Sequence, residues 1–440
     1  MVKSDRGKGG LRSTLSAIDL NKSTIDRIYH FVLSYSPTFP TYEFENLGLS
    51  ESSIILDPFC GTGTTLVAAK KSNIQSIGIE ANDFCNFVSN VKLNWNIDIQ
   101  KFRAIFAKIC CDLISEHKYF EEVFHTDNLK FSTMLSEYKA SWPSKDLLLK
   151  NHISDLPLIK LLHLKELILS IEAPKDLQDL LLCCFAAIVT PASNLRFGPT
   201  PGIGKIKVDS DIKKLFSSKC EDAANDIESM SKENTSAVVS LGDARDPVMY
   251  ASMKVDAIIT SPPYPAEHEY TRHTRLEMIL LDMVLENTDI RDIKKRMITG
   301  STRNVYKGDD EAALIANNQK ITDIIQEISL KVEKSKIRED GTTRELSGFE
   351  KLYAKTVGEY FGGMKKFLRN ALLALNDGGV ASILVGDSRT YKLVHIPTAE
   401  ILGELALEVG FKRFEIQLWR NNVSTAHKLD LNEYVLRLYK

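Results

Sequence analysis

The feature that most constrains the fold is a short apolar run that breaks into a glycine turn. The run 54–56 reaches Asp57, the chain then turns through Gly61 and Gly63, and a helix-forming stretch follows at 66–71. Glycine lets the backbone come close to a ligand, and the start of a helix offers free N–H groups. This order of elements is typical of the nucleotide site of an open α/β sheet, which we therefore predict here.

A second apolar run, residues 76–79, ends on Glu80. A carboxylate at the tip of the second strand is placed to accept hydrogen bonds from both hydroxyls of a ribose. A nicotinamide dehydrogenase is one competing interpretation of this half. The turn reads Gly-x-Gly-x-x-Leu, however, and lacks the third glycine of the dinucleotide fingerprint, which disfavours that interpretation.

A third strand-like run, 255–260, leads into Ser261-Pro262-Pro263-Tyr264. Two successive prolines cannot continue a sheet ladder, so the chain must leave the sheet at the carboxyl end of this strand. Ligands of open α/β sheets bind at that edge. We therefore expect the two distant loops to meet at one site.

Together, Asp-Pro-Phe-Cys-Gly-Thr-Gly-Thr (57–64) and Thr-Ser-Pro-Pro-Tyr (260–264) resemble the motifs of the DNA amino-methyltransferases. That family transfers a methyl group from S-adenosylmethionine to the exocyclic amino nitrogen of cytosine or adenine. The resemblance implies a Rossmann-like α/β fold, with a mostly parallel sheet, an antiparallel C-terminal edge hairpin and helical insertions. It implies S-adenosylmethionine as cofactor and double-stranded DNA as substrate.

The resemblance also assigns roles to individual residues. The expected cofactor-binding residues are Thr38, Phe39, Asp57, Phe59, Gly61, Gly63, Thr64, Glu80 and Asp243. The expected catalytic residues are Ser261, Pro262, Pro263 and Tyr264. The Ser261 hydroxyl and the Pro262 carbonyl would each accept one hydrogen of the target amine, and Tyr264 would stack on a flipped base.

The target base is the less constrained part of this interpretation. Serine at the start of the catalytic loop favours cytosine-N4, whereas Asp or Asn is common in adenine-directed members. Many Ser-Pro-Pro-Tyr enzymes have the reverse order of the two motifs, which weakens the inference, so adenine-N6 stays open. An RNA-directed (tRNA guanine) amino-methyltransferase and an inactive DNA-binding subunit are further alternatives.

Changes in composition and in the spacing of apolar residues divide the chain of 440 residues into segments. We expect a flexible tail at 1–24, a catalytic domain formed by 25–95 and 236–440, and a helical insertion at 96–235 that serves target recognition. A second helical, basic insertion is expected at 286–350. Helical spacing predicts helices at 23–33, 102–117, 144–149, 157–170, 177–189 and 311–336.

A net charge of −2 means that DNA contacts must come from local patches. The candidates are Asn194, Arg196, Tyr270, Arg272, Arg275, Lys295 and Arg296. The seven cysteines form no C-x-x-C pair, so we expect no metal. No signal peptide or membrane span is evident, so a cytoplasmic enzyme is expected, with a cognate restriction endonuclease as a candidate partner.

Overall fold

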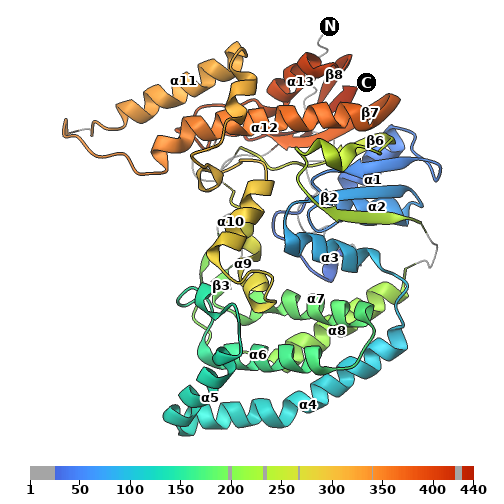
Figure 1. The fold of residues 1–440 in the computed structure, drawn as a ribbon, viewed down its shortest axis with the longest axis vertical. Helices are drawn as coiled ribbons and strands as arrows, with labels where there is room; N and C mark the ends of the chain where they lie inside the picture. Colours follow the sequence, from blue (N-terminus) through green and yellow to red (C-terminus); the bar gives the residue numbers. More distant parts are fainter. Residues whose placement is uncertain (1–24, 197–200, 231–234, 266–267, 339, 422–428) are drawn as a thin grey trace.

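The computed structural model describes residues 25–196, 201–230, 235–265, 268–338, 340–421 and 429–440. Figure 1 shows a sheet with its covering helices and, below it, a separate layer of helices. The predicted tail, residues 1–24, lies outside the described residues. The two layers meet along α3 (Asp83–Leu93), α7 (Lys175–Ala192) and α9 (Thr271–Leu280), whose buried residues belong to one core.

The sheet has seven strands in the order β5-β2-β1-β6-β7-β9-β8. Their bounds are β5 Ala237–Leu241, β2 Gln75–Glu80, β1 Ile54–Asp57, β6 Val255–Thr260, β7 Leu375–Gly386, β9 Glu433–Tyr439 and β8 Arg413–Arg420. The first five run parallel, and β9 is antiparallel to both of its neighbours. The expected α/β fold is confirmed. The closing hairpin is inserted so that β9 lies inside and β8 forms the edge.

The two central strands bring the two predicted loops together. In the β1–β6 pairing, Ile55 lies opposite Ala257 and Leu56 lies opposite Ile258. Parallel strands end at the same edge of a sheet, so the chain following Asp57 and the chain following Thr260 emerge side by side. The near-continuous apolar character of both strands follows from their burial on two faces.

Helices cover both faces of the sheet. One face packs against α1 (Thr38–Asn46) and α2 (Thr64–Lys71). The other packs against α12 (Tyr353–Ala374) and α13 (Thr398–Val409), which Figure 1 shows above the strands, and α11 (Gln319–Lys334) packs in turn against α12.

A buried ion pair fixes α1 on the first face. Glu43 is fully buried, and Arg437 of β9 donates to it over 2.9 Å from Nε. Ser382 of β7 donates to the same carboxylate over 2.6 Å. One carboxylate therefore joins a helix to two strands.

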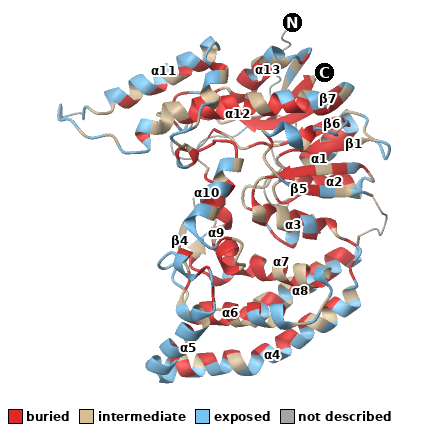
Figure 2. Ribbon diagram, in the orientation of Figure 1, coloured by how far each residue is buried: buried red, intermediate tan, exposed pale blue. Residues whose placement is uncertain are grey.

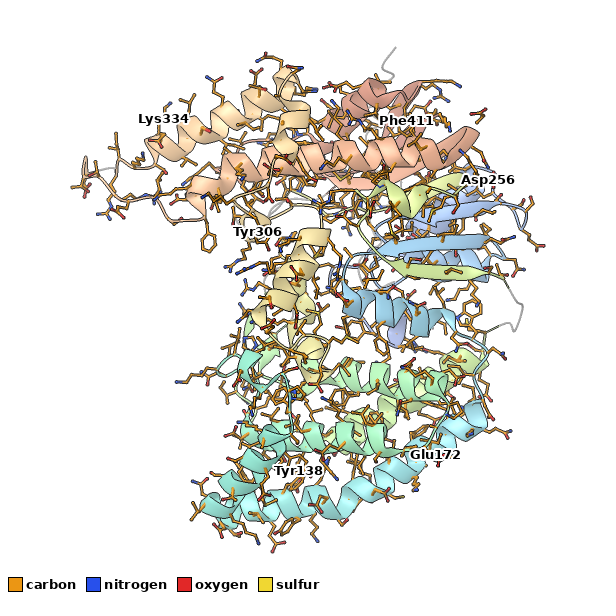
Figure 3. The ribbon with its side chains drawn as sticks, viewed as in Figure 1. Tyr138, Glu172, Asp256, Tyr306, Lys334 and Phe411 are labelled. Carbon is orange, nitrogen blue, oxygen red and sulfur yellow. The ribbon has the colours of Figure 1, made fainter. Side chains whose placement is uncertain are left out.

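Between β2 and β5 the chain forms a layer of helices, which we call the helical unit. It contains α4 (Ile99–Thr126), α5 (Asn128–Ala140), α6 (Asp155–Ser170), α7 and α8 (Ile212–Glu228). In α4 the buried residues Phe102, Phe106, Ile109, Leu113 and Phe120 recur at helical spacing. Figure 2 shows this pattern as buried stripes facing the neighbouring helices, with exposed residues outside.

Several predicted helices coincide with observed ones: 102–117 lies within α4, 157–170 within α6 and 177–189 within α7. The predicted helix at 144–149 is wrong, since only a 3₁₀ turn, Lys145–Leu147, forms there. The helix expected at 311–336 is divided into a 3₁₀ turn, Glu311–Ile315, and α11. The reason is local, because the Asn318 side chain accepts from the Ile321 N–H and starts a new helix.

The helix predicted at 23–33 is also wrong. Only Ile25–Arg27 forms a 3₁₀ turn, and the described chain then runs irregularly towards α1. Ile25, Ile28, Tyr29 and Phe31 are buried in the core that holds α3, α8 and α9. These tertiary contacts override the helical spacing of the apolar residues.

Candidate active site

A cavity lies at the carboxyl ends of the central strands, where the predicted loops emerge. Its walls come from seven stretches: the chain before α1, the glycine turn, the end of β2 with the start of α3, the turn after β5, the start of the catalytic loop, the residue before α9, and the end of α10 (Asn287–Arg296) with the segment that follows it. It is lined by Phe31, Leu33, Ser34, Tyr35, Pro58, Phe59, Cys60, Gly61, Thr62, Thr64, Glu80, Ala81, Asn82, Cys85, Gly242, Ala244, Ser261, Pro263, Tyr270, Arg296, Met297 and Ile298.

The glycine turn reaches this cavity through left-handed backbone. Gly61 has φ 53° and Gly63 has φ 87°, a region that side chains with a Cβ rarely adopt. Gly63 is the N-cap of α2, so the first N–H groups of that helix have no intrahelical partner. The Ser89 hydroxyl of α3 donates to the Gly61 carbonyl over 2.7 Å and fixes the turn. The Gly61 and Gly63 N–H groups are used by Glu80 and by the Cys60 carbonyl, so the donors on offer are those at the start of α2.

Glu80 closes the cavity at the end of β2. Its Oε2 accepts from the Gly61 N–H and its Oε1 accepts from the Asn82 N–H, both over 2.8 Å. Each oxygen keeps lone pairs for a further donor. Burial raises the pKa of the Glu80 carboxyl to about 7. This carboxylate is therefore poised to receive hydroxyl donors from a ligand.

Asp57 connects the cofactor turn to the strand that carries the catalytic loop. It is fully buried and accepts from the Thr260 hydroxyl over 2.6 Å, the Phe59 N–H over 3.1 Å and the Tyr35 hydroxyl over 3.0 Å. Burial raises its pKa. Asp57 does not line the cavity, so its role in the fold is to hold three wall segments in position.

The catalytic loop enters the cavity through Ser261 and Pro263. Ser261 Oγ donates its hydrogen to the Leu384 carbonyl over 3.1 Å and also interacts with the Tyr264 hydroxyl, and an oxygen with two lone pairs can accept a hydrogen from a ligand. Pro262 is buried and Tyr264 is half-buried, and neither lines the cavity. The Tyr264 ring packs against Gly386, where an added Cβ would lie 3.0 Å from it.

Residues 42–88, which run from α1 through the glycine turn into α3, match a protein-family model described as DNA methylase. This match supports the DNA amino-methyltransferase family that the two motifs predict. The matched segment contains both the glycine turn and Glu80, which line one side of the cavity.

Three relatives carry the name Type II methyltransferase. M.AvaI from a Nostoc species is 26% identical over 161 residues, which are 36% of this chain and 30% of that protein. M.MjaII from Methanocaldococcus jannaschii is 35% identical over 107 residues, 21% of this chain and 19% of the relative. M.HindIII from Haemophilus influenzae is 41% identical over 63 residues, which are 14% of this chain and 19% of the relative. The chain thus spans less than a third of the length of these relatives.

Not every residue that the amino-methyltransferase motifs suggest reaches the cavity. Phe59, Gly61, Thr64 and Glu80 line it, whereas Thr38, Phe39 and Gly63 do not. Phe39 is buried in the core on the α1 face, where its ring packs edge-on against Tyr35 and Trp419. The chain before β1 contributes Phe31, Leu33, Ser34 and Tyr35 instead.

Asp243 follows the end of β5 as expected but does not line the cavity. Its neighbours Gly242 and Ala244 line the cavity, but its own carboxylate binds the Arg245 guanidinium, with Nη2 to Oδ2 at 2.7 Å. The strongest local partner of this carboxylate is therefore an arginine two residues away.

The predicted DNA contacts fall into three groups. Asn194 is buried, its amide nitrogen donates to the Asn151 carbonyl over 3.1 Å, and its oxygen accepts from the Lys207 N–H over 2.7 Å. The amide thus holds a loop of the helical unit, and DNA binding by Asn194 stays a prediction. Arg196 and Lys295 are exposed at the surface.

The other four candidates lie nearer the cavity. Tyr270 and Arg296 line it, while Arg272 and Arg275 are half-buried on α9. Burial raises the pKa of Tyr270 to about 12, so its hydroxyl keeps its proton at neutral pH. Both residues, predicted as DNA contacts, thus lie in the cavity wall, and their binding of DNA stays a prediction.

Met297 and Ile298 are lining residues that sequence reasoning missed. They follow a basic run without belonging to any motif, so only the tertiary structure reveals them. Asn82, another lining residue, could have been recognised as the N-cap of a helix, since its side chain accepts from the Phe84 N–H over 2.9 Å at the start of α3.

Within the described ranges, no group of three or more His, Cys, Asp or Glu side chains is arranged to hold a metal. None of the described helices is long and apolar enough to span a membrane.

Proposed function

We propose that the protein is an S-adenosylmethionine-dependent DNA methyltransferase that methylates the exocyclic amino group of a flipped base, with cytosine-N4 favoured. One observation carries this proposal: a single cavity is lined both by Gly61 and Glu80 of the cofactor motif and by Ser261 and Pro263 of the catalytic motif. A methyl donor and an amine must share such a space for direct transfer.

The cofactor side of the cavity fits an adenosyl group. Glu80 offers two oxygens, each with one backbone N–H already in place, for the two hydroxyls of a ribose. Phe31, Phe59 and Ile298 supply apolar wall that suits a flat ring, and the start of α2 supplies N–H donors. When bound, S-adenosylmethionine would supply an electrophilic methyl group on a sulfonium.

The protein's own residues would prepare the amine. The lone pair of an exocyclic amine is delocalised into its ring, so the nitrogen is a poor nucleophile. Ser261 Oγ, whose own hydrogen is held by the Leu384 carbonyl, would accept one amine hydrogen, and the Pro262 carbonyl would accept the other. Accepting both hydrogens would turn the lone pair towards the methyl donor. The rate gain would come from orientation and fixed dipoles.

The choice of base rests on Ser261, which favours cytosine-N4 over adenine-N6. The matching family model, described as DNA methylase, supports DNA rather than RNA as substrate. Arg196, Arg272 and Lys295 would bind phosphates. A cognate restriction endonuclease is the partner that we propose for such an enzyme, and the helical unit is the region that we propose for target recognition.

The inactive DNA-binding subunit remains the second candidate. The left-handed Gly61 and Gly63, the Glu80 carboxylate facing the cavity and the complete Ser-Pro-Pro-Tyr loop favour an active enzyme over it.

The decisive experiment is transfer of a labelled methyl group. The purified chain is incubated with methyl-labelled S-adenosylmethionine and with unmethylated genomic DNA or tRNA, and the products are digested to nucleosides and resolved by mass. We expect N4-methylcytosine in DNA. N6-methyladenine would correct the base, label in tRNA alone would favour the RNA alternative, and cofactor binding without transfer would favour the inactive subunit.

A further inference from the structure

A strap formed by residues 294–300 runs between the last turn of α10 and the 3₁₀ turn Thr302–Asn304. It comes from the second insertion and carries neither motif. Arg296, Met297 and Ile298 nevertheless form part of the cavity wall, and Met297 and Ile298 are buried there. Figure 1 shows α10 directly below α12, beside the ends of the strands.

The strap is attached first to the cofactor side. The Arg296 Nε donates to the Ala81 carbonyl over 3.2 Å, and its Nη2 donates to the Asp83 carboxylate over 2.5 Å. Both partners lie within three residues after Glu80, so Arg296 holds the turn that aims the Glu80 carboxylate. Arg245, which binds Asp243 on the other wall, donates to the carbonyl at position 295.

The strap is attached next to the catalytic loop. Lys294 Nζ lies 3.2 Å from Glu269 Oε2, in the segment that leaves the loop. At Gly300 the strap passes so close to the loop that an added Cβ would lie 2.8 Å from the Tyr264 carbonyl oxygen. A contact under 3 Å with backbone forces the backbone to shift. The Tyr391 hydroxyl donates to the Gly300 carbonyl over 3.3 Å and fixes this approach.

We propose that this strap holds the cofactor cavity and the catalytic loop in register, with Arg296 and Gly300 as positioning residues for methyl transfer. The inference rests on the proposed function and adds a third element to its two motifs. Arg296 acts on the cofactor side through the turn after Glu80. Gly300 acts on the base side through the Tyr264 backbone. The two ends therefore predict different kinetic defects.

Binding of S-adenosylhomocysteine, measured by calorimetry, tests the cofactor end. Arg296→Ala should weaken binding about tenfold, because a charge-assisted bond and the cavity wall are lost together. Asp83→Asn should weaken it less, and adding it to Arg296→Ala should have little further effect, since both remove one contact. Arg338→Ala, an exposed arginine of the same insertion, is the matched control and should bind like wild type.

Single-turnover methyl transfer at saturating cofactor tests the base end. Gly300→Ala should slow transfer by about a hundredfold through misplacement of the loop, with S-adenosylhomocysteine affinity unchanged. Gly308→Ala is its matched control, because nothing lies within 4 Å of an added Cβ there. If Gly300→Ala does not fold, as judged by thermal melting, Tyr391→Phe removes the adjoining hydrogen bond and should slow transfer by a smaller factor.

Two results would overturn the strap. If Arg296→Ala binds S-adenosylhomocysteine with wild-type affinity, Arg296 does not position the cofactor side of the cavity. If Gly300→Ala transfers methyl groups at the wild-type rate, Gly300 does not position the catalytic loop. Where Gly300→Ala does not fold, the same result with Tyr391→Phe leads to the same conclusion. A wild-type chain that binds no S-adenosylhomocysteine would instead contradict the proposed function, so the two failures are distinguishable.

Discussion

The Glu80 carboxylate gives a quantitative prediction for cofactor binding. Its pKa is raised to about 7 by burial, and the negative charge of nearby Asp57 acts in the same direction. Ribose hydroxyls donate hydrogen bonds, so they bind the ionised carboxylate and compete with its protonation. Below the pKa, affinity should fall by a factor of about ten for each pH unit. The dissociation constant of S-adenosylhomocysteine should therefore be about tenfold higher at pH 6 than at pH 8.

Calorimetry in two buffers of different ionisation enthalpy would measure both the affinity and the protons released. Glu80→Gln should bind more weakly at pH 8, by about tenfold to a hundredfold, because it loses a charged acceptor. Its affinity should also be independent of pH between 6 and 8. A wild-type affinity that is equally flat, with no proton released near pH 6.5, would refute the reasoning.

The same group makes an opposite prediction for the unliganded protein. The folded-state pKa of Glu80 lies above the ordinary value of 4.5, so the folded state holds this proton more tightly than the unfolded chain does. Its contribution to stability is present below pH 4.5 and is lost as the pH rises through about 7. The ligand-free protein should thus lose stability over the pH range in which cofactor affinity increases.

Further predictions concern the groups around this carboxylate. Ser261→Ala should abolish methylated product while S-adenosylhomocysteine binding, by calorimetry, stays within twofold; unchanged product would contradict the proposed role of the hydroxyl. Asp57→Asn should lower the free energy of unfolding in urea by about 1–3 kcal/mol, because its amide nitrogen would face the hydroxyl or N–H donors that Asp57 now accepts; an unaltered midpoint would contradict this. Arg437→Ala should cost about 3–5 kcal/mol in the same assay, since it leaves Glu43 charged and buried without its partner; a loss under 1 kcal/mol would argue against the ion pair.

Much of the catalytic half of the fold is predictable from local pattern. The runs ending at Asp57, Glu80 and Thr260 are strands whose burial on both faces leaves a continuous apolar signal. The loops that follow these strands are then predicted to lie at the same edge of the sheet. The irregular segment from Ile28 to Tyr35 could not be predicted, because its apolar spacing is helical and only packing against three distant helices overrides it.

The details of the cavity were predictable only in part. Asn194 follows a helix in a Gly- and Pro-rich stretch and has the composition of an exposed contact, yet its amide is used by backbone groups far along the chain. Asp243 stands at the expected strand end, but a neighbouring arginine binds its carboxylate. In both cases the sequence does not reveal the hydrogen-bond partner, which is another group of the same chain.

The pairing of β1 with β6 has a consequence for biogenesis. Partners such as Ile55 and Ala257 are separated by the whole helical unit. Closing an unstructured loop of that size costs on the order of 5 kcal/mol in chain entropy. During synthesis, the backbone N–H and C=O groups on the β6 side of β1 therefore lack their strand partner until residues near 260 leave the ribosome. Early compaction of the intervening helices would shorten that wait, so mutations that loosen them should promote aggregation of nascent chains.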